Sequence, residues 1–485
     1  MIRAFALLAL LASGCASFQP APSARVDSAD AEARACAQWY LELDQRVARV
    51  GVRDAQARPV EGFPYLRVDR LLAALRGDAG SDPARLAALV QRMQALDAEG
   101  RRAELANLEP DAARARGDLD HARACAQTLR AADLADGDAR MRLLERAQVP
   151  DDYSTGERVL GLYVLTKYPF FSGVRQYQHE VTESFAAPLA RPTQRYAPGA
   201  ARAMPRREQA EAIARASRNP LGIPEPAGED LERLFAAHAP VFEVEQTGDF
   251  DVPGALRWAR GANTPTVDPA DLVVYRSVAW TRYHGRTLLQ LVYTIWFPAR
   301  PAASGTDLLS GALDGIVWRV TLAPDGEPLV YDTMHPCGCY HMFFPTPLAQ
   351  PRPSPESVLE WMFSPLSLPR VAEGERPVLR IATRTHYLER VRLEAGGADD
   401  GPRYALRDYD ALRSMPRPEG GRASAFDPDG LVEGTERAER FLFWPMGIDS
   451  PGAMRQWGRH ATAFVGRRHF DDADLLEKRF ELQLR

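Results

Sequence analysis

The sequence predicts an α+β fold, in which an α-helical N-terminal domain precedes a larger antiparallel β-rich domain with helical insertions. Three observations lead to this prediction. The chain has 485 residues, of which 45% are hydrophobic and 26% charged, so it is long enough for two or three domains with buried cores. Apolar residues recur at helical spacing up to about residue 149. Beyond about residue 240 the apolar runs are short and are separated by turn residues, as in hairpins.

The charge balance excludes one broad class of function. The formal net charge is -5, with 65 acidic and 60 basic residues, so no nucleic-acid partner is expected. The ordinary hydrophobic content also excludes a disordered chain, and five cysteines in this length exclude a small disulfide scaffold.

Residues 1–14 are expected to be a signal peptide. Arg3 precedes an unbroken apolar run from Ala4 to Ala12, and small residues follow it. Nine residues of helix span only about 14 Å, against roughly 30 Å of hydrocarbon in a bilayer, so this run is too short to be a membrane span.

The small residues Ala12-Ser13-Gly14 end directly at Cys15, and this stretch resembles the lipobox of a bacterial lipoprotein. The resemblance implies cleavage before Cys15 and acylation of that residue, which would then hold the protein to a lipid bilayer. Ala16, and not aspartate, follows the cysteine, which implies delivery to the inner leaflet of the outer membrane, facing the periplasm. Residues 15–25 are expected to form a lipidated tether.

Residues 26–150 are expected to form the helical domain. One helix is indicated by the spacing of Cys36, Tyr40 and Val47, and another follows Asp82, which is suited to cap the helix that Pro83 begins. Residues 151–230 are expected to form a connecting segment with a proline-rich linker.

Cys36 and Cys125 lie in similar helical settings, within two copies of the hexapeptide ARACAQ. In an exported protein the two cysteines could form a disulfide, which would stabilise the fold by about 4–5 kcal/mol through loop closure. The alternative is two small buried thiols on separate helices.

Residues 231–485 are expected to form the β-rich domain. Hairpins are predicted around His284-Gly285 and around residues 323–328, and residues 378–393 alternate like a strand, with His386 on its arginine-bearing, solvated face. Ser354-Pro355-Glu356 predicts the start of a helix, and the aromatic run from Phe441 to Pro445 predicts a core strand.

The densest group of chemically active side chains comprises His335, Cys337, Cys339 and His341, at alternate positions. An extended strand would place all four on one face, but its ends would lie about 20 Å apart, too far for one metal ion. A bend at Pro336 or Gly338 is therefore needed if the four are to act together.

Four interpretations of residues 335–341 remain open. Cys337 and Cys339 could form a disulfide or redox pair; a subset of the four residues could bind a zinc, copper or iron ion; a thiol could be a nucleophile with His335 or His341 as its base; or all four could simply be packed. The weaker histidines, His284, His460 and His469, could join this segment only through the tertiary fold.

The sequence lacks a phosphate-binding loop, a dinucleotide-binding glycine motif and a G-x-S-x-G nucleophile motif. We therefore expect a lipid-anchored cell-envelope protein with a binding or assembly role and a candidate thiol or metal site at residues 335–341. The alternative is a periplasmic metal- or cysteine-dependent enzyme that uses the same four residues.

Overall fold

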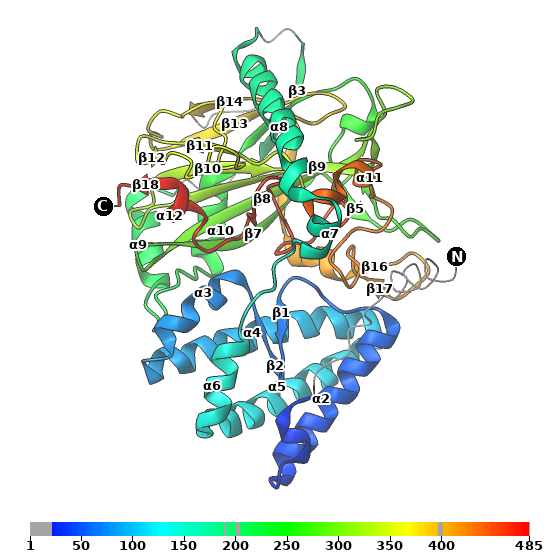
Figure 1. Cartoon of the computed structure of the whole chain (residues 1–485), viewed down its shortest axis with the longest axis vertical. Helices are drawn as coiled ribbons and strands as arrows, with labels where there is room; N and C mark the ends of the chain where they lie inside the picture. The colour runs from blue at the N-terminus through cyan, green and yellow to red at the C-terminus, as the bar shows by residue number, and fades with distance from the viewer. Residues whose placement is uncertain (1–21, 189–190, 200–203, 396–400, 485) are drawn as a thin grey trace.

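The computed structural model describes residues 22–188, 191–199, 204–395 and 401–484. Figure 1 shows a helical body in the lower part of the view and a larger β-rich body above it, which confirms the predicted fold class. The predicted signal peptide and Cys15 lie outside the described residues. The end of the predicted tether is described, and there Arg25 forms ion pairs with Asp133 (2.7 Å) and Asp136 (3.0 Å) of the helical body.

The helical body consists of five helices and one short hairpin. Its elements are α2 (Ala31–Val50), β1 (Arg58–Val60), β2 (Phe63–Val68), α3 (Arg70–Ala79), α4 (Pro83–Leu108), α5 (Ala112–Ala135) and α6 (Gly137–Arg146). An aspartate begins each helix and accepts hydrogen bonds from its first free backbone N–H groups: Asp30, Asp69, Asp82, Asp111 and Asp136. These caps satisfy backbone donors and complement the helix dipole, and the predicted start at Asp82-Pro83 is confirmed.

Cys36 of α2 and Cys125 of α5 form a disulfide, as the sequence allowed. Beside it, the Tyr40 hydroxyl donates a hydrogen bond to the Ala122 carbonyl (2.9 Å). The two helices are therefore joined covalently and by a buried hydrogen bond within the core of this body.

The β-rich body is built on a ten-stranded sheet with the order β11-β10-β9-β8-β7-β15-β3-β4-β13-β14. The strands, in chain order, are β3 (Thr193–Pro198), β4 (Val241–Glu245), β7 (Val273–Tyr283), β8 (Arg286–Arg300), β9 (Gly311–Leu322), β10 (Pro328–Met334), β11 (Met342–Pro345), β13 (Glu375–Ile381), β14 (Leu388–Ala395) and β15 (Arg403–Asp408). Strands β7 to β11 pair antiparallel, and both predicted hairpins are present. Three pairs are parallel: β15 with β7, β15 with β3, and β13 with β4.

Shorter elements surround the sheet. They are α7 (Thr155–Leu160), α8 (Tyr163–Ala186), α9 (Arg206–Ala216), α10 (Gly228–His238), α11 (Arg440–Phe443), α12 (Leu475–Arg479), the small strands β5 (Ala255–Arg257), β6 (Thr266–Asp268), β12 (Ala349–Pro351), β16 (Met415–Pro416), β17 (Arg422–Ala423) and β18 (Phe480–Leu482), and the 3-10 turns η1 (Ala24–Asp27), η2 (Asp249–Asp251), η3 (Tyr409–Arg413) and η4 (Trp444–Met446). The segment expected to be a connector thus supplies a strand of the main sheet, β3, as well as three helices.

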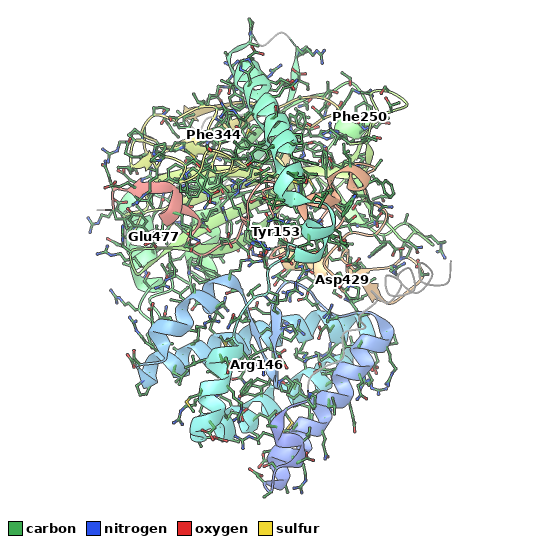
Figure 2. The ribbon with its side chains drawn as sticks, viewed as in Figure 1. Arg146, Tyr153, Phe250, Phe344, Asp429 and Glu477 are labelled. Atoms are coloured by element: carbon green, nitrogen blue, oxygen red, sulfur yellow. A yellow bond between two sulfur atoms is a disulfide. The ribbon has the colours of Figure 1, made fainter. Side chains whose placement is uncertain are left out.

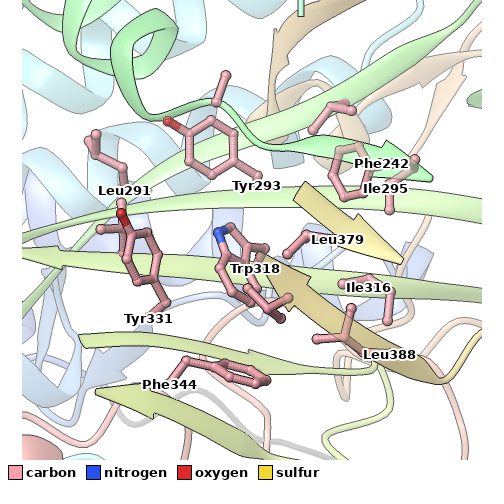
Figure 3. Close-up of a cluster of buried hydrophobic side chains, with 14 of the residues drawn as sticks. Phe242, Leu291, Tyr293, Ile295, Ile316, Trp318, Tyr331, Phe344, Leu379 and Leu388 are labelled. Carbon is pink, nitrogen blue, oxygen red and sulfur yellow. The ribbon is translucent and has the colours of Figure 1, made fainter. Parts of the chain in front are cut away.

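The core of the β-rich body lies on one face of the sheet (Figure 3). Trp318, Tyr331 and Phe344 come from three neighbouring strands, and the Trp318 ring lies 5.4 Å from that of Tyr331 and 5.6 Å from that of Phe344. Strands β9 and β10 are buried on both faces, because the C-terminal segment covers the face opposite this core. This double burial places charged residues such as Arg319 and Asp332 inside the molecule, where they pair with each other.

The two bodies contact each other through buried polar groups. Arg413 of η3 donates two hydrogen bonds to the carboxylate of Asp54 in the helical body, at 3.0 and 2.8 Å, and Gln456 donates a third at 2.8 Å. The linking chain is held at Tyr153, which Figure 2 labels between the bodies; its hydroxyl donates to the Ala463 carbonyl (2.8 Å) and accepts from the Ala463 N–H (3.1 Å).

Two predicted elements are wrong. No helix starts at Ser354-Pro355-Glu356, because the backbone carbonyls of Glu360 and Trp361 accept from the Arg468 guanidinium and not from helical N–H groups. Phe441 to Pro445 is not a core strand but the turn of helix α11 followed by η4, and the Phe441 side chain is 74% exposed.

Candidate functional site

Residues 335–341 form a tight loop between β10 and β11, and not a straight strand. The His335 N–H donates to the Cys339 carbonyl (3.0 Å), and the Gly338 N–H donates to the His335 carbonyl (2.8 Å). Gly338 has φ +90°, and a Cβ there would lie 2.5 Å from the Ala461 carbonyl oxygen. Only glycine fits this position, so the bend anticipated at Gly338 is present.

His335 belongs to a buried row of alternating histidines and aspartates. Its Nδ1 lies 2.9 Å from one carboxylate oxygen of Asp314 in β9, and the other oxygen lies 3.1 Å from Nδ1 of His386. On the far side, His386 Nε2 lies 3.4 Å from the carboxylate of Asp251, an ion-pair contact longer than a good hydrogen bond. The row joins β9, the end of β10, the β13–β14 turn and η2.

The predicted position of His386 on a solvated face is therefore wrong. Its imidazole is fully buried and stacks on the Phe297 ring at 4.1 Å with an interplanar angle of 1°. Residues 378–393 form two strands, and the turn between them places both Arg384 (φ 66°) and His386 (φ 50°) in the left-handed region. The turn thus directs the ring inward.

The charges along this row alternate. Burial alone would lower the pKa of His386, but Asp251 and Asp314 outweigh it and raise the pKa above its ordinary value. Burial would raise the pKa of Asp314, yet His335 and His386 hold it well below its usual range. Burial lowers the pKa of His335 despite Asp314, so the proton of the row is held on His386.

His341 lies on a separate polar cluster. Its Nε2 is 2.9 Å from the Asp332 carboxylate, which also accepts two hydrogen bonds from Arg319, at 2.9 and 2.5 Å. Burial lowers the pKa of His341 to about 3, so the ring is neutral at physiological pH. His335 and His341 therefore serve different aspartates and do not form one site.

Cys337 and Cys339 are free thiols in this structure. Cys337 is buried, whereas Cys339 is partly exposed and lines a cavity. Contact with Cys337, together with burial, raises the pKa of the Cys339 thiol well above its ordinary value. Because the thiolate is the reactive form, this environment opposes a nucleophilic role for Cys339.

Among the described residues, no three side chains of histidine, cysteine, aspartate or glutamate are grouped so that they could hold a metal ion. The structure thus brings the four predicted residues into one loop but not into one ligand set. Of the other histidines, His460 contacts this loop, with Nε2 3.1 Å from the Pro336 carbonyl oxygen. His284 lies at the β7–β8 turn near Glu477, and His469 lies near Asp152 and Asp472.

The loop forms one wall of a cavity of about 700 Å³, which sequence patterns did not indicate. The opposite wall comes from α8 and α11, and most of the lining is apolar. The apolar and aromatic lining residues include Phe170, Val174, Tyr177, Phe363, Tyr387, Leu442, Phe443 and Phe464. This size and lining are typical of pockets for small apolar ligands.

A few polar groups face the cavity beside Cys339. The Tyr387 hydroxyl donates to the Tyr340 hydroxyl (2.9 Å), and the Tyr177 ring packs on both rings. Burial raises the pKa of the Glu439 carboxyl to about 7, against the opposing effect of Arg300 and Arg437. Glu439 therefore changes its charge near neutral pH.

Comparisons with models of protein families, with curated protein sequences and with solved structures find no match to this chain. One sequence signal could have pointed to the histidine–aspartate row: Asp314 interrupts the apolar β9 run between Leu313 and Ile316. A carboxylate inside a buried strand requires a partner.

Proposed function

We propose that this protein is a lipid-anchored cell-envelope protein that binds an apolar ligand in the cavity bounded by α8, α11 and residues 335–341. The cavity is the observation that carries this proposal. Its walls are mainly aromatic and aliphatic, and its polar lining includes Cys339 and Tyr340 together with the three glutamates Glu180, Glu360 and Glu439. This arrangement suits a ligand with a mainly apolar body and no negative charge, because the glutamates of the lining disfavour an anion.

The envelope location is supported by the lipobox-like residues at Cys15 and by the disulfide Cys36–Cys125, which is typical of proteins in an oxidising compartment. Among the described residues, no helix is long and apolar enough to cross a membrane. Cys15→Ser is expected to release the protein from the outer-membrane fraction, as measured by membrane fractionation. Labelling of this variant with radioactive palmitate, equal to that of the natural chain, would contradict lipidation at Cys15.

Ligand binding is tested with N-phenylnaphthylamine, an uncharged apolar fluorophore whose emission rises in apolar sites. Gly173 of α8 lines the cavity, and a Cβ there would meet no atom within 4 Å. Gly173→Leu is therefore expected to fill cavity space without strain and to weaken the fluorophore's Kd about tenfold, ~1.4 kcal/mol. Fluorescence titration measures the change.

Gly117→Leu is the matched control, because Gly117 is also an exposed helical glycine with open space around its Cβ but lies on α5 of the helical body. This control is expected to bind the fluorophore like the natural protein. Equal affinities for the Gly173 and Gly117 variants would show that the fluorophore binds elsewhere and would overturn the cavity proposal.

The charge of Glu439 predicts a pH dependence for anionic ligands. Anilinonaphthalene sulfonate, the anionic relative of the first probe, is expected to bind more weakly as the pH rises through about 7, because the Glu439 carboxylate then repels it. In Glu439→Gln the affinity for this anion should be independent of pH over the same range. Titrations at several pH values check this, and an unchanged pH profile in the variant would assign the effect to another group.

The alternative of a cysteine-dependent enzyme makes a different prediction for the same loop. A nucleophilic Cys339 would react with iodoacetamide at neutral pH much faster than an ordinary thiol, because it would be a thiolate. The raised pKa favours the binding role, so slow alkylation of Cys339 is expected.

A further inference from the structure

Nine large apolar side chains are exposed on adjoining elements of the β-rich body, and we refer to them as the apolar patch. They are Val159, Leu160, Leu162, Val164, Leu165, Tyr168, Phe441, Leu442 and Trp444. Only three other large apolar side chains of the described residues are comparably exposed: Val50, Met141 and Leu308. Such a concentration of exposed apolar residues is typical of an interaction surface.

The patch is held on a fixed frame. Helix α7, the start of α8, and α11 with η4 lie side by side in Figure 1, and these elements contact one another. A Cβ on Gly161 would lie 2.5 Å from Pro445 Cβ, so the α7–α8 junction packs directly on η4. Arg158 reinforces this junction by donating to the carbonyls of Met446 (2.8 Å) and Gly466 (2.7 Å).

The rings of Phe170 and Phe443, 5.3 Å apart, join α8 to α11 beneath the patch. Because these contacts fix the elements relative to one another, the nine side chains stay exposed in the folded protein. Leu442 belongs both to the patch and to the cavity lining, and Tyr168 of the patch directly precedes Pro169 and Phe170 of the cavity wall. The patch thus borders the cavity.

Two cations lie within the patch segments. Within the segments that carry the patch, residues 159–168 and 440–444, the only charged residues are Lys167 and Arg440. Glu157 and Asp449 lie just outside these segments, and Arg158 and Glu439 are buried. Exposed Leu and Phe with flanking Trp, Tyr, Lys and Arg are the composition of surfaces that lie in the interface of anionic bilayers.

We propose that the apolar patch inserts into the surface of an anionic phospholipid bilayer, with Lys167 and Arg440 beside the lipid phosphates. The occupant is the bilayer because the patch combines apolar side chains with the interfacial residues Tyr168 and Trp444 and with two cations, Lys167 and Arg440, which suits acyl chains below phosphate groups. Insertion would bring the bordering cavity to the membrane surface. The proposal does not depend on the ligand, because it concerns the outer face of α7, α8 and α11.

Trp444 is a reporter within the patch, since it is 39% exposed and the other tryptophans are more buried. The natural chain is reconstituted into phosphatidylcholine–phosphatidylglycerol vesicles whose acyl chains carry bromine, which quenches tryptophan fluorescence on contact. Quenching that disappears in Trp444→Phe is expected. Its loss in Lys167→Glu/Arg440→Glu and its weakening in vesicles without phosphatidylglycerol would support the role of charge.

In the triple variant Leu160→Ser/Leu165→Ser/Phe441→Ser, the Trp444-dependent quenching is expected to fall about tenfold. The reason is that three large apolar side chains are no longer available to transfer from water into the bilayer. Val50→Ser/Met141→Ser removes exposed apolar residues from the helical body and should leave the quenching unchanged. Folding of each variant is verified by its circular dichroism spectrum.

Three outcomes would overturn the proposal: no quenching of Trp444 in the natural chain, equal quenching in the triple and control variants, or light scattering that shows a dimer in solution which the triple substitution dissociates. The last result would assign the patch to a second copy of this chain.

Discussion

His386→Asn is expected to lower the free energy of unfolding of the β-rich body by about 3–5 kcal/mol, because it removes the cation between two buried carboxylates. In the natural protein His386 lies 3.1 Å from Asp314 and 3.4 Å from Asp251, and the variant leaves these carboxylates without that partner. It also removes the ring that stacks on Phe297. Urea denaturation followed by the fluorescence of the buried tryptophans Trp296 and Trp318 measures the loss.

His284→Asn is the matched control for this substitution. His284 also has a left-handed backbone, with φ 47° against 50° for His386, so asparagine meets the same backbone preference at both positions. The His284 side chain is 66% exposed at the β7–β8 turn. The control should therefore change the free energy of unfolding by less than about 0.5 kcal/mol. Equal destabilisation by the two variants would mean that backbone strain, and not the buried charge, explains the effect.

The stabilisation by His386 should also depend on pH. Its pKa in the folded protein is raised, so its contribution is complete below the unfolded value of about 6.5 and is lost as the pH rises through the folded pKa. The contribution of Asp251 to stability depends on pH in the opposite direction. Its pKa in the folded protein is lowered to about 2, so this contribution is present above about pH 3.9, the unfolded pKa, and is lost as the pH falls towards 2. The difference between the natural protein and His386→Asn should therefore be largest between about pH 4 and 6.5, and should shrink in alkaline solution.

The sequence predicted the fold class because its signals are local. Helical periodicity, aspartate caps and the His284-Gly285 turn each depend on residues close together in the chain, and the structure confirms them. The turn at residues 382–387 has no such signal, since it contains no glycine, proline or asparagine. It is held by Asp251, more than 130 residues earlier, which accepts hydrogen bonds from the Arg384 N–H (2.8 Å) and the Thr383 hydroxyl (2.6 Å). The alternation of residues 378–393 alone therefore predicted a solvated position for His386, whereas its ring is buried.

The candidate site was predicted in part for the same reason. The loop of residues 335–341 is visible as a cluster in the sequence, and the glycine that bends it could be identified there. Two of its partners could not, because Asp314 and Glu439 come from other segments and reach the loop only in the folded chain. Asp332 is only nine residues before His341, but its contact with that ring depends on the bend of the loop. The cavity wall also depends on α8 lying across the sheet edge, a contact that amphipathic periodicity does not specify.

Replacing the cysteines of the helical body is the second change with a large expected effect. Cys36→Ala/Cys125→Ala opens a loop with a sequence separation of 89, and the chain-entropy model then predicts a loss of about 4–5 kcal/mol in the free energy of unfolding. The loss should appear in the unfolding of helices, followed by far-ultraviolet circular dichroism, because α2 and α5 both belong to this body.

Cys337→Ala/Cys339→Ala provides the comparison, since it makes the same two chemical changes where the structure has free thiols. Adding dithiothreitol should lower the stability of the natural protein to that of Cys36→Ala/Cys125→Ala and leave the latter unchanged. It should also destabilise Cys337→Ala/Cys339→Ala, which keeps the disulfide between α2 and α5. If dithiothreitol had no effect on the natural protein, the Cys36–Cys125 disulfide would not stabilise the chain. If the loss of stability instead followed replacement of Cys337 and Cys339, the stabilising cross-link would lie in the loop beside the cavity, and the redox interpretation of that loop would replace the binding one.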